Sequence, residues 1–159
     1  MKRPAAPTGW EKLDWIEHDS YLGLADADVD RGRCLEAFDR IPITGRVIDA
    51  TSIAPPFIAC FTEADDLVPV EVRRVADRVV TSVRLCWTND VDDLEADDRG
   101  EWEEIGRLPI RSGACLAWDP IHQRTEGGLV AEVRPGGYRA SCFFYDGDCL
   151  GLRIDHQPG

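Results

Sequence analysis

Beyond Gly45, apolar and polar residues alternate with a period of two along much of the chain, which is the pattern of half-buried β-strands. Segment 79–87 shows the pattern clearly, because Val83 and Leu85 fall on one face while Ser82 and Arg84 fall on the other. The segments with strand character are 46–53, 57–62, 68–75, 79–87, 102–110, 114–118, 129–134, 138–145 and 149–154. The close spacing of these segments predicts a mainly antiparallel β-fold.

Turn residues between the segments predict which strands pair. Segments 68–75 and 79–87 read as a hairpin, and so do 102–110 and 114–118 around Ser112-Gly113. The stretch 129–154 reads as two further hairpins that share their central strand. Its turns are Pro135-Gly136-Gly137 and Asp146-Gly147, and Asp-Gly between apolar runs is a strong hairpin signal.

The first part of the chain is less regular. Residues 1–9 read as a loose terminus, segment 10–21 as a strand or a helical turn, and segment 30–41 as a short helix that ends at Pro42. The expected fold is therefore all-β in the main: an antiparallel β-sandwich of about eight strands with at most one short helix. A chain of 159 residues is expected to form a single domain, residues 1–159.

Charge narrows the classes of partner. The formal net charge is −12, so direct binding to nucleic acid or to an anionic membrane is not expected, whereas a basic protein partner is compatible. The sequence has neither the apolar run of a signal peptide nor that of a membrane span, so we expect a cytoplasmic protein. Its six cysteines contain no C-x-x-C pair and are expected to be reduced, mostly buried thiols.

The acidic segment 89–104 is the most distinctive local feature, with nine carboxylates against the single basic residue Arg99. We expect residues 89–101 to form an acidic loop. One interpretation is a solvated surface loop, because like charges repel each other. The other is a mimic of nucleic acid that enters a basic cleft, with Trp102 as a partly exposed aromatic anchor. The candidate partner-binding residues are Asp90, Asp92, Asp93, Glu95, Asp97, Asp98, Glu101 and Trp102.

No catalytic or cofactor motif stands out. Asp26-x-Asp28-x-Asp30 lacks the glycine and glutamate that complete a calcium loop, so neither a metal nor a cofactor is expected. Asp119 and His122 are spaced so that a carboxylate could approach an imidazole, but no G-x-S-x-G elbow supplies a nucleophile. An enzyme is therefore not the expected class, and a hydrolase with a dispersed carboxylate–His site is the alternative.

Three segments together resemble a known group of proteins. They are VPVEVRRV, EWEEIGRLPIRSGACLAWDP and VAEVRPGGYRASCFFYDGDCLGLRI, within residues 68–154. Their order resembles small bacterial β-sandwich proteins that include the competence nuclease inhibitor (competence protein J) and related immunity proteins of toxin systems. The resemblance implies a cytosolic protein that neutralises a toxin or nuclease by stoichiometric binding. An interaction module without a toxin partner remains a further alternative.

Overall fold

Strands make up most of the fold. The computed structural model describes residues 10–17, 21–38, 40, 47–52, 55–61, 67–74, 79–86, 102–123, 126–145 and 148–157. Their elements are β1 (Trp10–Glu17), β2 (Tyr21–Asp26), α1 (Arg31–Phe38), β3 (Val47–Ala50), β4 (Phe57–Phe61), β5 (Leu67–Arg74), β6 (Val80–Cys86), β7 (Trp102–Ile110), β8 (Ala114–Trp118), β9 (Leu129–Glu132), β10 (Gly136–Tyr145) and β11 (Asp148–His156).

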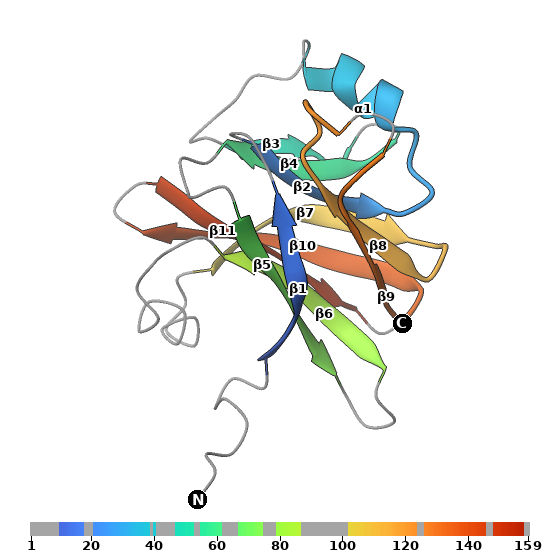
Figure 1. Cartoon of the computed structure of the whole chain (residues 1–159), viewed down its shortest axis with the longest axis vertical. Coiled ribbons are helices and arrows are strands. Elements are labelled where there is room, and N and C mark those ends of the chain that lie inside the picture. The colour runs from blue at the N-terminus through green and yellow to red at the C-terminus, as the bar shows by residue number, and fades with distance from the viewer. Residues whose placement is uncertain are drawn as a thin grey trace, which may run out of the picture.

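The strands form two antiparallel sheets that pack face to face (Figure 1). The larger sheet has the order β1-β5-β6-β11-β10-β7, and the smaller has the order β3-β4-β2-β8-β9. The predicted antiparallel sandwich is confirmed. The structure describes eleven strands, more than the expected number of about eight. β1 lies in segment 10–21, where the sequence pattern suggested a strand or a helical turn, and β2, which begins at Tyr21, was not predicted.

Alternating side chains of both sheets meet in the core between them. Val72, Leu85 and Leu152 come from the larger sheet and contact Leu24 and Ile58 from the smaller one, all fully buried. Burial of this apolar surface is the main force that holds two sheets together.

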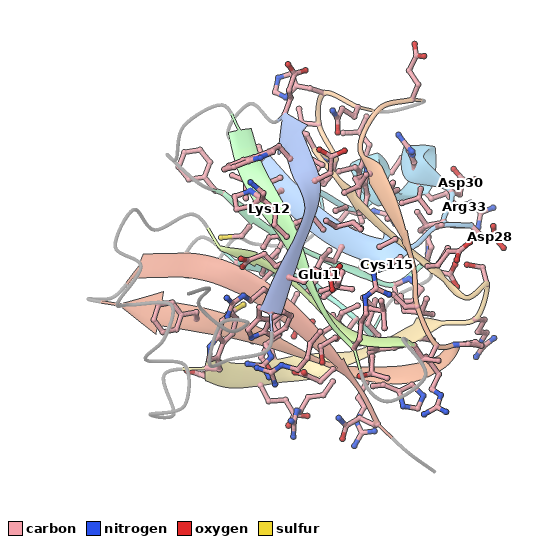
Figure 2. All side chains as sticks on the ribbon, turned by 60° about the horizontal axis from the view of Figure 1, so that its bottom comes forward. Glu11, Lys12, Asp28, Asp30, Arg33 and Cys115 are labelled. Carbon is pink, nitrogen blue, oxygen red and sulfur yellow. The ribbon has the colours of Figure 1, made fainter. Side chains whose placement is uncertain are left out.

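Helix α1 covers the other face of the smaller sheet, as Figure 1 shows, and confirms the short helix predicted in segment 30–41. Its Cys34 and Ala37 join a second apolar cluster that includes Phe57 and the fully buried Trp118. The carboxylate of Asp30 accepts a hydrogen bond from the Arg33 backbone N–H at 3.2 Å, which caps the helix (Figure 2). Among the described helices, none has the length and apolar character needed to cross a membrane.

Two predicted hairpins are confirmed by the register of their strands. In one, β5 pairs with β6, with Val72 opposite Val83. In the other, β10 pairs with β11, with Cys142 opposite Leu152. Segment 129–134 shows the alternation expected of a half-buried strand, because Ala131 is buried while its neighbour Val130 is exposed.

The other two predicted pairings are wrong. Strand β7 pairs with β10 in the larger sheet, while β8 and β9 pair with each other in the smaller sheet. The chain therefore passes between the sheets after Ile110 and again after Glu132. The carboxylate of Asp26 accepts the backbone N–H of Arg111 at 2.6 Å and fixes the first crossing. At the second, the Tyr138 hydroxyl donates to the carbonyl oxygen of Arg134.

The described cysteine side chains are all buried, as the sequence predicted. These are Cys34, Cys60, Cys115 and Cys142. Burial raises the pKa of Cys115 from 9.0 to about 12, and it raises the pKa of Cys34 to a similar value. Burial also raises the pKa of the Tyr138 hydroxyl above its ordinary value of 10.0. Each of these groups is therefore more stable uncharged in the folded protein than in the unfolded chain.

We expect the free energy of unfolding to decrease as the pH rises above 9.0. A folded pKa above the unfolded one means that the stabilisation is complete below pH 9.0 and falls between 9.0 and 12 for Cys115. The loss should approach about 1.4 kcal/mol per pH unit for such a thiol. Urea unfolding from pH 7 to 11 measures it, with Cys115→Ala as the control. A constant stability difference between wild type and variant across this range would contradict the assignment.

Candidate functional site

Charged and aromatic side chains gather on the outer face of the larger sheet, the face that points away from the smaller sheet. Trp10, Arg73, Ser82 and Asp155 follow one another across β1, β5, β6 and β11. Glu71, Arg84 and Arg153 form the adjacent row on β5, β6 and β11. No described helix or strand lies over this face, since α1 packs on the smaller sheet.

Trp10 lies among three arginines of these rows. Its ring is 4.3 Å from the guanidinium carbon of Arg84, 4.5 Å from that of Arg73 and 5.1 Å from that of Arg153. Only 6% of Trp10 is exposed, so the indole and the guanidinium groups shield one another from water. Such contacts gain strength when they are desolvated. We call these four residues the arginine–tryptophan cluster.

Carboxylates neutralise part of the cluster's charge. Arg84 donates from Nε to Glu71 Oε1 at 2.8 Å, and only 3% of the Arg84 side chain is exposed. Arg153 donates from Nε to Asp155 Oδ2 at 2.9 Å, while the Ser82 hydroxyl donates to Asp155 Oδ1 at 2.6 Å. A buried guanidinium is tolerated only when it is paired in this way. The cluster is thus a rigid, charged surface on the sheet.

Trp102 stands at one end of this face and is partly exposed, as the sequence predicted. It packs on Phe143, with 5.3 Å between the ring centroids, and the Arg153 guanidinium carbon lies 5.5 Å from its ring. Phe143 is itself buried. The indole is therefore held in place by its contacts with Phe143 and Arg153.

The acidic residues predicted to bind a partner cannot be placed in the same way. Asp90, Asp92, Asp93, Glu95, Asp97, Asp98 and Glu101 lie outside the described residues, as does the loop 89–101. The strands on either side are described. Cys86 ends β6 and Trp102 begins β7, and both belong to one row across the sheet with Gly151 and Phe143. The acidic segment is therefore attached at the same end of the sheet as Trp102.

Two further arginines lie on the exposed flank of the face. Arg107 on β7 is directly opposite Arg139 on β10, and both are exposed. Neither makes an ion pair within the part of the chain that the structure describes. Like charges in directly opposed positions destabilise a sheet, so an external carboxylate would be stabilising here.

Sequence reasoning missed the arginine–tryptophan cluster, although a signal was present. Arg84 and Arg153 each stand between apolar residues in a predicted strand, and Arg73 follows Val72 in another, which places all three on the polar face. Their burial depends on Trp10, which the sequence pattern could not bring to them.

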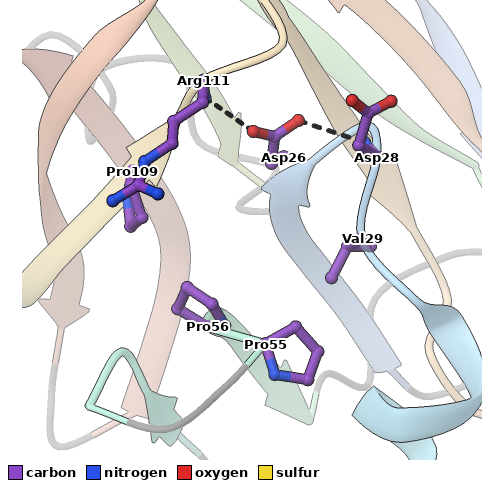
Figure 3. A pocket seen from close by; sticks show the side chains of 7 residues that line it. All are labelled: Asp26, Asp28, Val29, Pro55, Pro56, Pro109 and Arg111. Carbon is purple, nitrogen blue, oxygen red and sulfur yellow. Dashed lines mark hydrogen bonds between the residues drawn. The ribbon is translucent and has the colours of Figure 1, made fainter.

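A pocket of about 280 Å³ lies at the far end of β7 from Trp102 (Figure 3). Its lining comes from the end of β2, the loop before α1, the residues before β4 and the end of β7. The lining residues are Asp26, Asp28, Val29, Pro55, Pro56, Pro109 and Arg111. The walls are mainly apolar, with charged groups at the rim.

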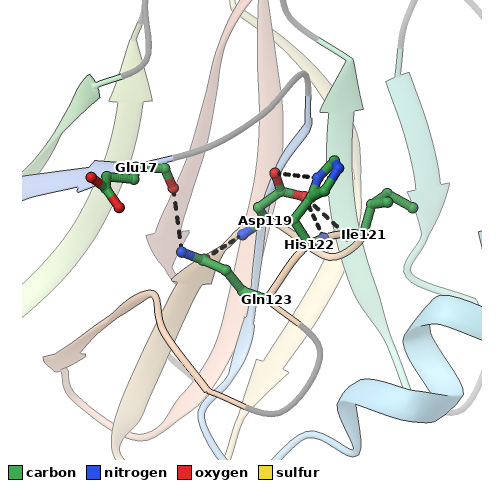
Figure 4. A network of polar contacts seen from close by, with 5 residues as sticks. All are labelled: Glu17, Asp119, Ile121, His122 and Gln123. Carbon is green, nitrogen blue, oxygen red and sulfur yellow. Dashed lines mark hydrogen bonds and ion pairs between the residues drawn. The ribbon is translucent and has the colours of Figure 1, made fainter.

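A carboxylate–imidazole contact lies in the loop that follows β8 (Figure 4). Asp119 Oδ2 is 3.0 Å from His122 Nδ1, as the spacing of the two residues suggested. The Asp119 carboxylate is buried and also accepts the backbone N–H groups of Ile121 and His122. Gln123 holds the loop through the Asp119 backbone N–H, which donates to its side chain at 2.9 Å.

This contact supplies two parts of a catalytic apparatus. A carboxylate on Nδ1 fixes the neutral ring in the tautomer whose Nε2 is a proton acceptor, which is the arrangement of a general base. A hydrolase also needs a nucleophile and an oxyanion site. Within the described residues, no group of three or more His, Cys, Asp and Glu side chains is arranged to hold a metal ion.

Comparison with known proteins adds no relationship. No protein-family model, curated protein or solved structure matches the chain.

Proposed function

We propose that this protein binds a partner protein through the Trp102 end of the outer face, and that it acts as an immunity or inhibitor protein. It would neutralise a toxin or nuclease by stoichiometric binding, in the cytoplasm and without a cofactor. The observation that carries the proposal is the position of Trp102. It is partly exposed, held by Phe143 and Arg153, and adjacent in sequence to the acidic segment.

Energetic arguments favour this surface as an interface. Tryptophan and arginine are the residues most enriched among interface hot spots, and rigid anchors lose little conformational entropy on binding. The acidic segment would meet a basic region of the partner and accelerate association. A partner carboxylate would meet Arg107 and Arg139 on the adjoining flank. The resemblance of residues 68–154 to nuclease inhibitors and immunity proteins supports the same class of function.

A hydrolase is the second candidate, and the Asp119–His122 contact is the observation that favours it. The two functions can be tested by different variants, because the Asp119–His122 contact lies in the loop after β8 while Trp102 begins β7. A hydrolytic activity that His122→Gln abolishes and Trp102→Ala leaves intact would favour the hydrolase.

Binding kinetics test the proposed interface. The partner is identified by pull-down from native lysate and mass spectrometry, and rates are then measured by surface-binding kinetics at two salt concentrations. Trp102→Ala should accelerate dissociation about 30-fold, which corresponds to about 2 kcal/mol for a buried aromatic anchor. Neutralising Asp92, Asp93, Asp97 and Asp98 should instead slow association by about tenfold at low salt and flatten its salt dependence.

Trp15→Ala is the matched control. Trp15 is 47% exposed and contacts Lys12, but it lies on β1, at the opposite edge of the larger sheet from β7. Its replacement should leave both rates within about twofold of wild type, as for a surface residue outside the interface. Equal effects of Trp15→Ala and Trp102→Ala would refute a specific role for Trp102.

A further inference from the structure

The pocket at the far end of β7 has a second feature in addition to its volume: besides Asp26, whose carboxylate oxygens accept hydrogen bonds, it is lined by one acidic and one basic side chain. Asp28 and Arg111 are both exposed lining residues. Neither side chain makes an ion pair within the described part of the chain. Figure 3 shows Asp28 beside Val29 on one side, and the Arg111 side chain running along Pro109 on the other.

The backbone around the pocket offers few hydrogen-bond donors to a ligand. Pro55, Pro56 and Pro109 have no N–H group, and they form much of the wall. The backbone N–H groups of Asp28, Arg111 and Ser112 are already donated to the Asp26 carboxylate, at 3.0, 2.6 and 3.1 Å. The Arg111 guanidinium is therefore the main donor that lines the pocket, and the Asp28 carboxylate is the main free acceptor.

Asp26 stays charged and contributes to the field of the pocket. Partial burial raises the pKa of its carboxyl group, but the hydrogen bonds from Ser112, Asp28 and Arg111 outweigh burial and hold the pKa below its ordinary value. All of these donors are neutral groups, so the negative charge of Asp26 persists between Asp28 and the backbone of Arg111. The two carboxylates attract a cation, while the Arg111 guanidinium attracts an anion.

We infer that this pocket binds a small zwitterion with an apolar body, in the manner of an amino acid. The ligand's ammonium group would pair with Asp28 and its carboxylate with Arg111, while its carbon chain would contact Val29 and the three prolines. A ligand with both charges pairs with both Asp28 and Arg111, whereas a simple amine leaves Arg111, and a simple acid leaves Asp28, without an ionic partner in the pocket. This site is independent of the interface at Trp102.

Ligand analogues with the wild-type protein provide the first test. The zwitterionic probes are L-leucine, whose two charges lie close together, and 6-aminohexanoate, whose two charges lie far apart. Hexanoate and pentylamine are analogues with a single charge. An NMR titration of the isotopically labelled protein should give at least one zwitterion a dissociation constant about tenfold below that of either analogue. The largest changes in chemical shift should occur at Asp28, Val29 and Arg111.

Variants provide the second test. Asp28→Asn should weaken the binding of the zwitterion and of pentylamine about tenfold, and it should leave the binding of hexanoate unchanged. Arg111→Gln should weaken the binding of the zwitterion and of hexanoate by a similar factor and leave the binding of pentylamine unchanged. Asp30→Asn and Arg134→Gln are matched controls, since both are exposed charges outside the pocket. Zwitterions that bind no better than the analogues, or that bind to both pocket variants as tightly as to the wild-type protein, would overturn the assignment.

Discussion

Replacing Glu71 by Gln is expected to lower the free energy of unfolding by about 3 kcal/mol, because it removes a carboxylate that pairs with a buried guanidinium. Arg84 is 3% exposed at its side chain and donates to Glu71 at 2.8 Å. Water cannot replace the lost carboxylate at that depth. The nearby guanidinium groups of Arg73 and Arg153, which share the Trp10 ring, would increase the unfavourable charge.

Two comparisons isolate the cause. Arg74 and Glu11 form an ion pair of similar length, 3.1 Å, but their side chains are 35% and 52% exposed. Glu11→Gln should therefore cost about 0.5 kcal/mol or less. The double variant Glu71→Leu with Arg84→Met should recover stability to within about 1 kcal/mol of wild type, since neither charge then remains buried. Urea unfolding of all variants measures these differences. Equal costs for Glu71→Gln and Glu11→Gln would show that burial does not decide the result.

Gly128→Ala is expected to lower the free energy of unfolding by a similar amount, about 3 kcal/mol, because backbone strain and a steric clash act together. Gly128 has a φ of +85°, where side chains other than hydrogen are unfavourable. A Cβ atom at this position would also lie 2.7 Å from the Ala117 carbonyl oxygen and 2.8 Å from Trp118 Cβ. These atoms belong to the buried end of β8, so they have little room to move.

Gly113→Ala is the matched control for this prediction. Gly113 has nearly the same φ, +81°, but the nearest atom to an added Cβ is the Val133 carbonyl oxygen at 3.7 Å. Only the conformational cost of about 1 kcal/mol is expected there. Thermal or urea unfolding gives the comparison. If the two alanine variants were equally stable, close packing at Gly128 would not be the reason for its glycine.

Local pattern was enough to locate most strands but not to pair them. Alternation identified the strands around Val83 and Leu85, and the Asp146-Gly147 signal joined β10 to β11. The same kind of turn signal failed at Ser112-Gly113 and at Pro135-Gly136-Gly137. A turn marks where a strand ends, whereas its partner depends on which sheet has an open edge. That information lies in distant contacts such as Gly23 with Trp118.

The same distinction applies to the candidate site, where features set by local sequence could be predicted and features set by distant contacts could not. Trp102 could be predicted as partly exposed because it stands between glutamates, and the Asp119–His122 contact follows from a spacing of three residues. The arginine–tryptophan cluster could not be predicted. The polar face of β6 was correctly assigned to Arg84, but the burial of Arg84 requires Trp10 of β1, which lies two strands away in the sheet.

The place of β11 in the larger sheet has a consequence for how the protein is made. β11 is the last described strand along the chain, yet it lies between β6 and β10 in the interior of the sheet. During synthesis β6 leaves the ribosome long before its neighbour exists, so its edge stays open until translation reaches residue 156. Pairings this distant in sequence also make folding slow, on a scale of milliseconds to seconds for β-sandwiches. An open strand edge of this kind is a site of aggregation during that interval unless charge repulsion or a chaperone protects it.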